Sequence, residues 1–185
     1  THLLKKHKVT SFLGEAQLTT IGQVEITTKH DKVQLSSENI VLATGARARE
    51  LKGFEADGKN IWTYKHALTP KNIPKKLLII GSGAIGMEFA SFYNTLGADT
   101  TIVEALDHIL PVEDREISSF AKKQFEKQGI KVLENSKAMH LKREKGVFTV
   151  EIDTLGESSC IKCDTIISAV GIVGNTEGLG LEELE

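Results

Sequence analysis

Residues 75–104 read KKLLIIGSGAIGMEFASFYNTLGADTTIVE, and this stretch decides the fold of the chain. The short apolar run at residues 77–80 is typical of a strand that is buried on both faces. It is followed by the spacing G-x-G-x-x-G, formed by Gly81, Gly83 and Gly86. The stretch therefore begins as a strand that turns sharply through a glycine loop.

A helix and a second strand follow the glycine loop. Apolar residues recur at helical spacing from Met87 to Tyr93, and Gly97 supplies a C-terminal stop. The β-branched run at residues 100–103 then ends on the carboxylate of Glu104. Strand, glycine loop, helix, strand and terminal acid come in the order of a dinucleotide-binding unit.

Each glycine has a physical role in such a unit. Gly81 permits the tight turn, Gly83 lets the backbone approach a pyrophosphate, and Gly86 lets helix and strand pack closely. The pyrophosphate is expected at the helix N-terminus, where unpaired N–H groups and the positive end of the helix dipole favour an anion.

Glu104 predicts which dinucleotide is bound. It lies roughly 20 residues after Gly81, the offset of the acid that binds a ribose 2′-hydroxyl. The same carboxylate would repel a 2′-phosphate, and residues 105–107 (ALD) supply no arginine to accept one. The sequence therefore favours NAD over NADP, unless Arg115 folds back towards the site.

Composition excludes several classes of function. The 185 residues are 40% apolar with a formal net charge of −2, as in an ordinary soluble globular protein. There is no basic face for nucleic acid and no apolar stretch of the roughly 20 residues that span a membrane. Two cysteines do not form a secreted disulfide framework, so we expect bacterial cytoplasm, or mitochondrial matrix in a eukaryote. Because the chain opens without methionine, we expect it to be part of a longer protein.

Flanking segments suggest the organisation of the remaining chain. Residues 1–45 hold short alternating runs that predict a small antiparallel β segment, ending in a strand at 39–45. This segment is too poor in large apolar residues to be a domain alone. Residues 46–74 are interrupted by charges, glycines and prolines, and are expected to form a linker. The nucleotide-binding domain is expected at 75–175.

After Glu104 the pattern continues as α/β. Asp114 is a good N-cap for a helix that ends before Gly129, with Ile117, Phe120, Ala121 and Phe125 on one face. A strand at 130–133, three alternating segments between 138 and 162, and an apolar strand at 165–170 follow. The predicted fold class is α/β, a Rossmann-like doubly wound parallel sheet whose later crossover is a β-meander.

A cysteine pair and six histidines could suggest redox or metal chemistry, but both features are interpreted as structural. Cys160 and Cys163 form C-x-x-C within or beside a strand, not at a helix N-terminus that would lower a thiol pKa. No second cysteine pair or histidine pair accompanies them, so no metal site is expected. The six histidines are scattered and none has the spacing H-x-x-x-H.

The order Ala-Thr-Gly, linker, G-x-G-x-x-G, β-meander, Ala-Val-Gly resembles the middle of the flavoprotein disulfide reductases. The similar stretches are GEAQL, NIVLATGARARELKGF, residues 75–118 and CDTIISAVGIVGNTEGLGLEEL, which together cover most of the chain. Within this family the similarity is greatest to members that oxidise dihydrolipoamide on the lipoyl domain of 2-oxo acid dehydrogenase complexes. The resemblance implies NAD and FAD as cofactors, a homodimeric parent protein, and no nucleic-acid or membrane partner.

The resemblance also implies roles for individual residues. Glu88 would lie near the nicotinamide, between it and the flavin, and Ala138 would cover the adenine. The residues expected to bind NAD are Gly81, Ser82, Gly83, Ala84, Ile85, Gly86, Met87, Glu88, Glu104, Ala138 and Gly171. The residues expected to touch FAD are Gly14, Thr44, Gly45 and Ala46. By this resemblance, residues 1–45 are the end of the first FAD-domain segment and residues 176–185 begin the return to it.

The chain departs from the family pattern at residues 171–175, which read GIVGN where many relatives have Gly-Arg-x-Pro-Asn. The family's redox pair, spaced C-x-x-x-x-C, and its catalytic His-x-x-x-x-Glu motif would lie outside the chain. No catalytic residue is therefore expected here, and the chain alone should not turn over. Two alternatives remain: another disulfide reductase or NADH oxidase of the same fold, and a stand-alone dinucleotide-binding module.

Overall fold

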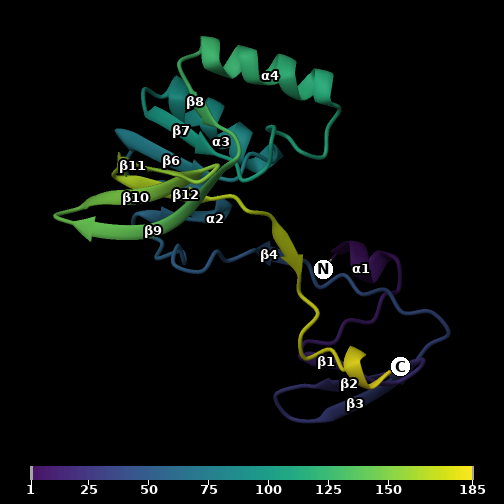
Figure 1. Ribbon diagram of the computed structural model, residues 1–185. Coiled ribbons are helices and arrows are strands. Elements are labelled where there is room, and N and C mark those ends of the chain that lie inside the picture. Colours follow the sequence, from purple (N-terminus) through teal and green to yellow (C-terminus); the bar gives the residue numbers. More distant parts are fainter. Residues whose placement is uncertain (1, 185) are drawn as a thin grey trace. The chain divides into compact units, whose positions relative to one another are not determined.

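The computed structural model describes residues 2–184. Residues 1 and 185, the outer ends of the segments expected at 1–45 and 176–185, lie outside the described part. The chain forms two compact units. Unit 1 comprises Thr1–Arg47 and Gly174–Glu185, and unit 2 comprises Ala48–Val173 (Figure 1).

Unit 2 is built on a parallel sheet of five strands in the order β5-β12-β6-β7-β8. The strands are β5 (Ile61–Trp62), β6 (Lys76–Ile80), β7 (Asp99–Val103), β8 (Lys131–Leu133) and β12 (Thr165–Ser168). Leu77, Leu78 and Ile79 are at most 1% exposed, so the central strand β6 is buried on both faces, as its apolar run predicts.

Helices cover one face of this sheet. Helix α3 (Ala84–Thr95) packs Met87, Ala90 and Tyr93 against Leu77 and Ile79 of β6. Helix α4 (Arg115–Lys127) lies against the same core. The Asp114 carboxylate accepts a hydrogen bond from Glu116 N–H at 2.8 Å, so the predicted N-cap is confirmed.

An antiparallel meander covers the other face. It consists of β9 (Ser136–Glu144), β10 (Val147–Thr154) and β11 (Glu157–Cys163), in the order β11-β10-β9. Phe148, Val150 and Ile152 of β10 pack against Leu78 and Ile80. Unit 2 is thus a mixed α/β fold, a parallel sheet between helices and a meander, as expected from the sequence (Figure 1).

The predicted apolar face of α4 is partly wrong. Ala121 and Phe125 pack against the core, but Ile117 is 58% exposed and Phe120 is 63% exposed. The buried side is centred on Ser118, which is 1% exposed and whose hydroxyl donates to Leu110 O. Ser118 lies about one turn from Ala121 and about two turns from Phe125, so the helix contacts the sheet through a stripe displaced from the most hydrophobic one.

The segment expected as a linker contributes to the sheet. Ile61 and Trp62 form the edge strand β5 and are 7% and 6% exposed. The short helix α2 (Tyr64–Ala67) follows, and Ala67 O accepts a hydrogen bond from the Tyr93 hydroxyl at 2.6 Å. Leu68, the residue after α2, is 69% exposed.

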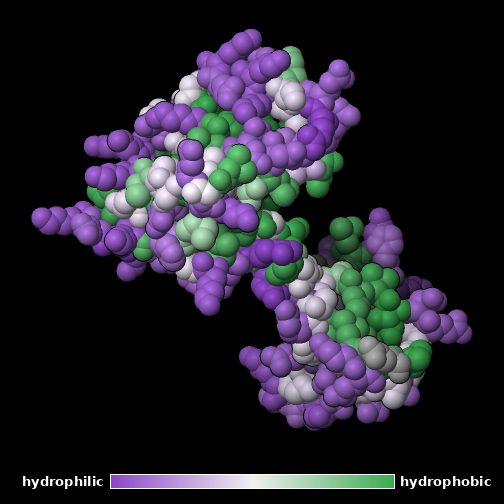
Figure 2. Space-filling view, viewed as in Figure 1, coloured by the Kyte–Doolittle hydropathy of each residue, from purple (hydrophilic) through white to green (hydrophobic). Residues whose placement is uncertain are grey.

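Unit 1 contains a three-stranded antiparallel sheet in the order β1-β2-β3. Its elements are α1 (His2–Lys6), β1 (Glu15–Thr20), β2 (Gln23–Thr27), β3 (Lys32–Ser36) and the 3-10 helix η1 (Leu181–Glu183). The strand expected at 39–45 is not formed, and Val41 is 87% exposed. Figure 2 shows apolar surface on this unit, and Leu3, Leu13 and Val41 are among its exposed side chains.

The short strands β4 (Ala46–Ala48) and β13 (Ile172–Gly174) pair as a two-stranded sheet. The sequence did not predict either strand. Both lie where the chain passes between the residue ranges of the two units.

The two cysteines occupy opposite environments on β11. Cys163 is 2% exposed and belongs to the core beneath the meander, whereas Cys160 is exposed. Residues three apart in a strand point to opposite faces, so these thiols do not face each other. Burial raises the pKa of the Cys163 thiol to about 12, with a further contribution from the negative charge of Asp164.

We expect one fast-reacting thiol in the folded chain. At pH 8 Cys160 should react with a disulfide reagent at the rate of an exposed thiol, while Cys163 reacts only in denaturant. Cys160→Ser should remove the fast phase and Cys163→Ser should keep it. Two fast thiols in the folded protein would contradict this placement.

Candidate functional site

A cavity of about 550 Å³ opens in unit 2 at the carboxyl ends of β6 and β7. This is the edge of a parallel sheet at which ligands bind. The residues between β12 and Gly171, together with the start of β9, complete its wall. Six residues expected to bind NAD line the cavity: Gly81, Ser82, Gly83, Glu104, Ala138 and Gly171.

Two glycines of the loop are required by the protein itself. Gly81 has a φ of +98°, and a Cβ there would lie 2.5 Å from Ala169 O. A Cβ on Gly86 would clash with Gly81 O, where the first turn of α3 meets the end of β6. A side chain at Gly81 would push the loop away from the segment after β12, and one at Gly86 would force α3 away from the end of β6.

Gly83 is different, because no contact with residues 2–184 requires a glycine at this position. Its φ of −65° is open to any residue, and a Cβ there would meet no atom within 4 Å. It is the N-cap of α3 and lines the cavity, so the added methyl group would project into open space at the helix N-terminus. The first N–H groups of a helix have no intrahelical partner and can bind an anion there.

Glu104 follows β7 and lies against the glycine loop at the cavity wall. It is 7% exposed, and its carboxylate is held by three donors. Oε2 accepts from Ser82 N–H at 2.9 Å and from the Ser82 hydroxyl at 2.6 Å, and Oε1 accepts from Leu106 N–H at 2.9 Å. A buried carboxylate needs such donors to offset its lost hydration.

Backbone hydrogen bonds fix the position of this acid. Glu104 N–H donates to Leu133 O of β8, and Glu104 O accepts from Ser136 N–H of β9, both at 2.8 Å. Leu110 N–H donates to Ser82 O at 3.0 Å, which ties the following loop to the glycine loop. Acid and loop therefore form one hydrogen-bonded assembly.

Several lining residues were not anticipated from the sequence. Met139 is an extra residue in β9, because Ala138 pairs with Ile152 and His140 with Glu151. Such a β-bulge re-aims side chains, and Met139 lines the cavity at 49% exposure. Leu51, Leu106, Pro111 and Lys137 also line it. A bulge leaves no reliable mark in a single sequence, whereas the apolar loop after Glu104 was a visible signal.

The remaining residues of the expected NAD set belong to α3 and do not line the cavity: Ala84, Ile85, Gly86, Met87 and Glu88. Gly86 and Met87 are buried between helix and sheet. Glu88 is exposed and has no side-chain hydrogen bond or ion pair with any residue between 2 and 184.

Arg115 does not fold back towards Glu104. Its guanidinium donates to Asp107 at 2.9 Å, and its side chain is 74% exposed. The hydrogen bond from His108 and then that from Arg115 lower the pKa of Asp107. Within the described residues, Lys137 is the one basic side chain that lines the cavity.

The four residues expected to touch FAD lie in unit 1, and contacts within that unit involve three of them. A Cβ on Gly14 would clash with Thr27 O, so the packing against β2 requires this glycine. The Thr44 hydroxyl donates to Asn175 O at 2.6 Å, and Asn175 N–H donates to Gly45 O. Ala46 begins β4.

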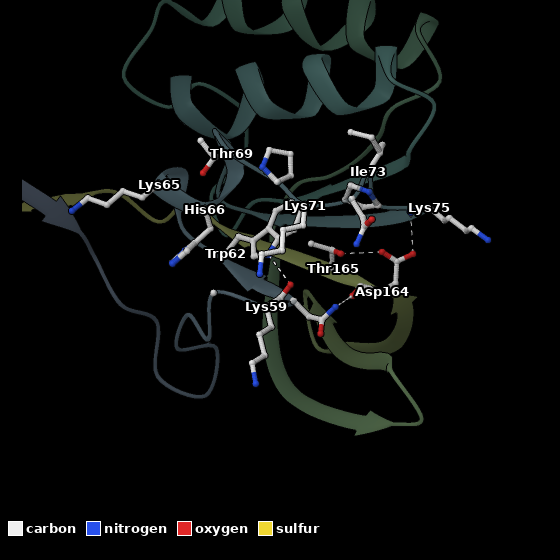
Figure 3. A pocket seen from close by; sticks show the side chains of 15 residues that line it. Lys59, Trp62, Lys65, His66, Thr69, Lys71, Ile73, Lys75, Asp164 and Thr165 are labelled. Carbon is white, nitrogen blue, oxygen red and sulfur yellow. Dashed lines mark hydrogen bonds between the residues drawn. The ribbon is translucent and has the colours of Figure 1, made fainter.

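A second cavity of about 520 Å³ lies at the opposite, amino-terminal end of β6 and β12 (Figure 3). Lys59, Lys65 and Lys75 line it, but Figure 3 shows their side chains pointing away from one another. The Asp164 carboxylate in its wall accepts from Lys75 N–H, Lys76 N–H and the Thr165 hydroxyl, so it has a structural role. These side chains do not converge on a common point.

Two further features, a metal site and a membrane-spanning helix, are absent among residues 2–184. No group of three or more His, Cys, Asp or Glu side chains there is arranged to hold a metal ion. No helix in that range is long and apolar enough to cross a membrane.

Known proteins resemble this chain over its whole length. The family described as pyridine nucleotide-disulphide oxidoreductase matches residues 1–185. Dihydrolipoyl dehydrogenase of Rhizobium etli is 43% identical over 98% of this chain and 41% of the relative. The enzyme of the same name from Zymomonas mobilis is 46% identical over 98% of this chain and 40% of the relative. The chain thus spans about two fifths of the length of these relatives.

A solved structure agrees in fold. The crystal structure of LpdA from Mycobacterium tuberculosis superposes with a TM-score of 0.83 and 27% identity, covering 99% of this chain and 41% of that one. From the family match over all its residues, we conclude that this chain belongs to the pyridine nucleotide-disulphide oxidoreductase family.

Proposed function

We propose that unit 2 is a Rossmann-like NAD-binding domain, with the dinucleotide in the 550 Å³ cavity beside the glycine loop. The observation that carries the proposal is the buried Glu104 carboxylate, held at the end of β7 against that loop. The residues of unit 2 would then hold NAD, the hydride acceptor, in a protein related to dihydrolipoyl dehydrogenase.

The loop has the features that a pyrophosphate needs. The free N–H groups of the first turn of α3 and the positive end of its dipole favour an anion at Gly83. A methyl group at Gly83 would project into the space that the phosphates require. A bound pyrophosphate would therefore explain a glycine that the packing of residues 2–184 does not require. Gly81 and Gly86 hold the loop close to β6.

Glu104 supplies selectivity for the ribose. Its carboxylate accepts hydrogen bonds from ribose hydroxyls and repels a 2′-phosphate. Arg115 is paired with Asp107 outside the cavity, so it does not offset that repulsion. The site therefore favours NAD over NADP. The positive charge of Lys137 at the cavity wall reduces the difference in affinity between the two nucleotides.

The rest of the cavity suits a flat apolar base. Ala138 and Met139 of β9 and Leu106 and Pro111 of the loop after β7 present a largely apolar surface. Adenine buried there gains the hydrophobic contribution common to cofactor sites. Gly171, whose φ is +109°, brings backbone to the opposite edge.

NAD, when bound, accepts a hydride, and the residues of unit 2 bind and orient it. Glu88 is exposed on the second turn of α3, and we propose that it lies near the nicotinamide. The cysteines of the chain are Cys160 and Cys163, which do not have the spacing C-x-x-x-x-C. For that reason we propose that the chain alone does not turn over.

The whole-protein activity is a proposal drawn from the relatives. Dihydrolipoamide on the lipoyl domain of a 2-oxo acid dehydrogenase complex would be oxidised, and the electrons would pass through a redox disulfide and FAD to NAD. In that scheme, unit 1 would supply FAD contacts through Gly14, Thr44, Gly45 and Ala46. We also propose that the parent is a homodimer in bacterial cytoplasm or mitochondrial matrix.

Glu104→Gln should weaken NADH binding about tenfold and reduce the difference in affinity between NADH and NADPH. The substitution removes the charge that attracts ribose hydroxyls and repels a 2′-phosphate. Calorimetric titration of the chain with both nucleotides measures this. The exposed Glu113→Gln should behave as the wild type. A wild-type preference for NADPH would instead move the chain to an NADP-linked reductase branch.

Gly83→Ala and Gly86→Ala should separate binding from folding. Gly83→Ala should change the free energy of unfolding by no more than about 1 kcal/mol, because an alanine N-cap costs about that much. The same variant should weaken NADH binding at least tenfold. Gly86→Ala should lower the stability markedly, because its methyl group clashes with Gly81 O. Thermal melts and NADH titrations test both, and a Gly83→Ala variant with unchanged NADH affinity would argue against a phosphate site.

A further inference from the structure

Ser82, between the first two glycines of the loop, contacts Glu104 twice. Its backbone N–H and its hydroxyl both donate to Glu104 Oε2, at 2.9 Å and 2.6 Å. Ser82 is fully buried, and hydrogen bonds to a charged acceptor shielded from water are short and strong. The spacing G-x-G-x-x-G requires no particular side chain at this position, so the hydroxyl needs its own explanation.

The donors around Glu104 leave little free capacity. A carboxylate has about four acceptor positions, two on each oxygen. Oε2 uses both of its positions for Ser82, and Oε1 uses one for Leu106 N–H. Counting donors between residues 2 and 184, one acceptor position is left, and it belongs to Oε1.

We propose that Ser82 restricts Glu104 to a single ribose hydroxyl of the dinucleotide. This inference rests on the proposed NAD site. A ribose carries two neighbouring hydroxyls, and one of them donates to Oε1. The other would face Oε2, where Ser82 already occupies both positions. The Ser82 hydroxyl is itself buried and uses its hydrogen in the bond to the carboxylate.

Ser82 is thus a positioning residue. It fixes the rotation of the carboxylate so that Oε1, rather than both oxygens, is presented to the sugar. Removal of the hydroxyl frees one acceptor position on Oε2 and allows the second ribose hydroxyl to donate there.

Analogues of NADH that lack the 2′- or the 3′-hydroxyl of the adenosine ribose test this directly. We expect one analogue to bind the wild-type chain about tenfold more weakly than NADH, and the other to bind within about twofold. Calorimetric titration of the folded chain with NADH and both analogues measures the three affinities.

The Ser82→Ala variant should change the pattern. Both analogues should then bind about five- to tenfold more weakly than NADH, because both hydroxyls now have an acceptor. Ser119→Ala on α4 is the matched control: Ser119 is exposed, its side chain forms no hydrogen bond with residues 2–184, and the variant should keep the wild-type pattern.

The outcomes distinguish this inference from the proposal beneath it. Equal losses for both analogues with the wild-type chain, or a wild-type pattern in folded Ser82→Ala, would overturn the role of Ser82 while NADH binding still supported the NAD site. Absence of NADH binding by the folded wild-type chain would overturn the NAD site, and this inference with it. If Ser82→Ala does not fold, the wild-type comparison decides alone.

Discussion

Burial of the parallel strands on both faces is the constraint on which unit 2 depends. In β6 the side chains of Leu77 and Ile79 point to one face and those of Leu78 and Ile80 to the other, so each face needs its own apolar cover. Helices α3 and α4 supply one cover and the meander β9–β11 the other. With both faces covered, the carboxyl ends of the strands stay accessible, and the cavity lies there.

The same arrangement places a firmly held carboxylate next to an accessible helix N-terminus. Glu104 is held by backbone hydrogen bonds to β8 and β9, and its carboxylate by Ser82 and Leu106. Gly83, the residue after Ser82 in the glycine loop, faces open space. A buried, fully oriented anion therefore borders an accessible helix N-terminus, a combination suited to a ligand with both hydroxyl and phosphate groups.

The local patterns of the chain predicted much of this fold, and they failed where contacts between distant residues decide. The N-cap at Asp114 and the stop before Gly129 gave α4 its bounds, because capping depends on neighbouring residues. Its buried stripe was predicted only in part, since the angle at which a helix meets a sheet is not local. The strand expected at 39–45 is absent, whereas the unpredicted strands β4 and β13 pair across 124 or more residues of sequence.

Sequence alone determined the order of elements around the glycine loop, the acid after β7 and the expectation of NAD, because spacing and residue type carry these. Tertiary structure alone decided that Met139 is re-aimed by a bulge, that Arg115 is paired with Asp107, and that Cys163 is buried while Cys160 is not. It also brought the Ser82 hydroxyl against Glu104. Hydrogen bonds between separate segments form only after the sheet has assembled, and a linear pattern does not record them.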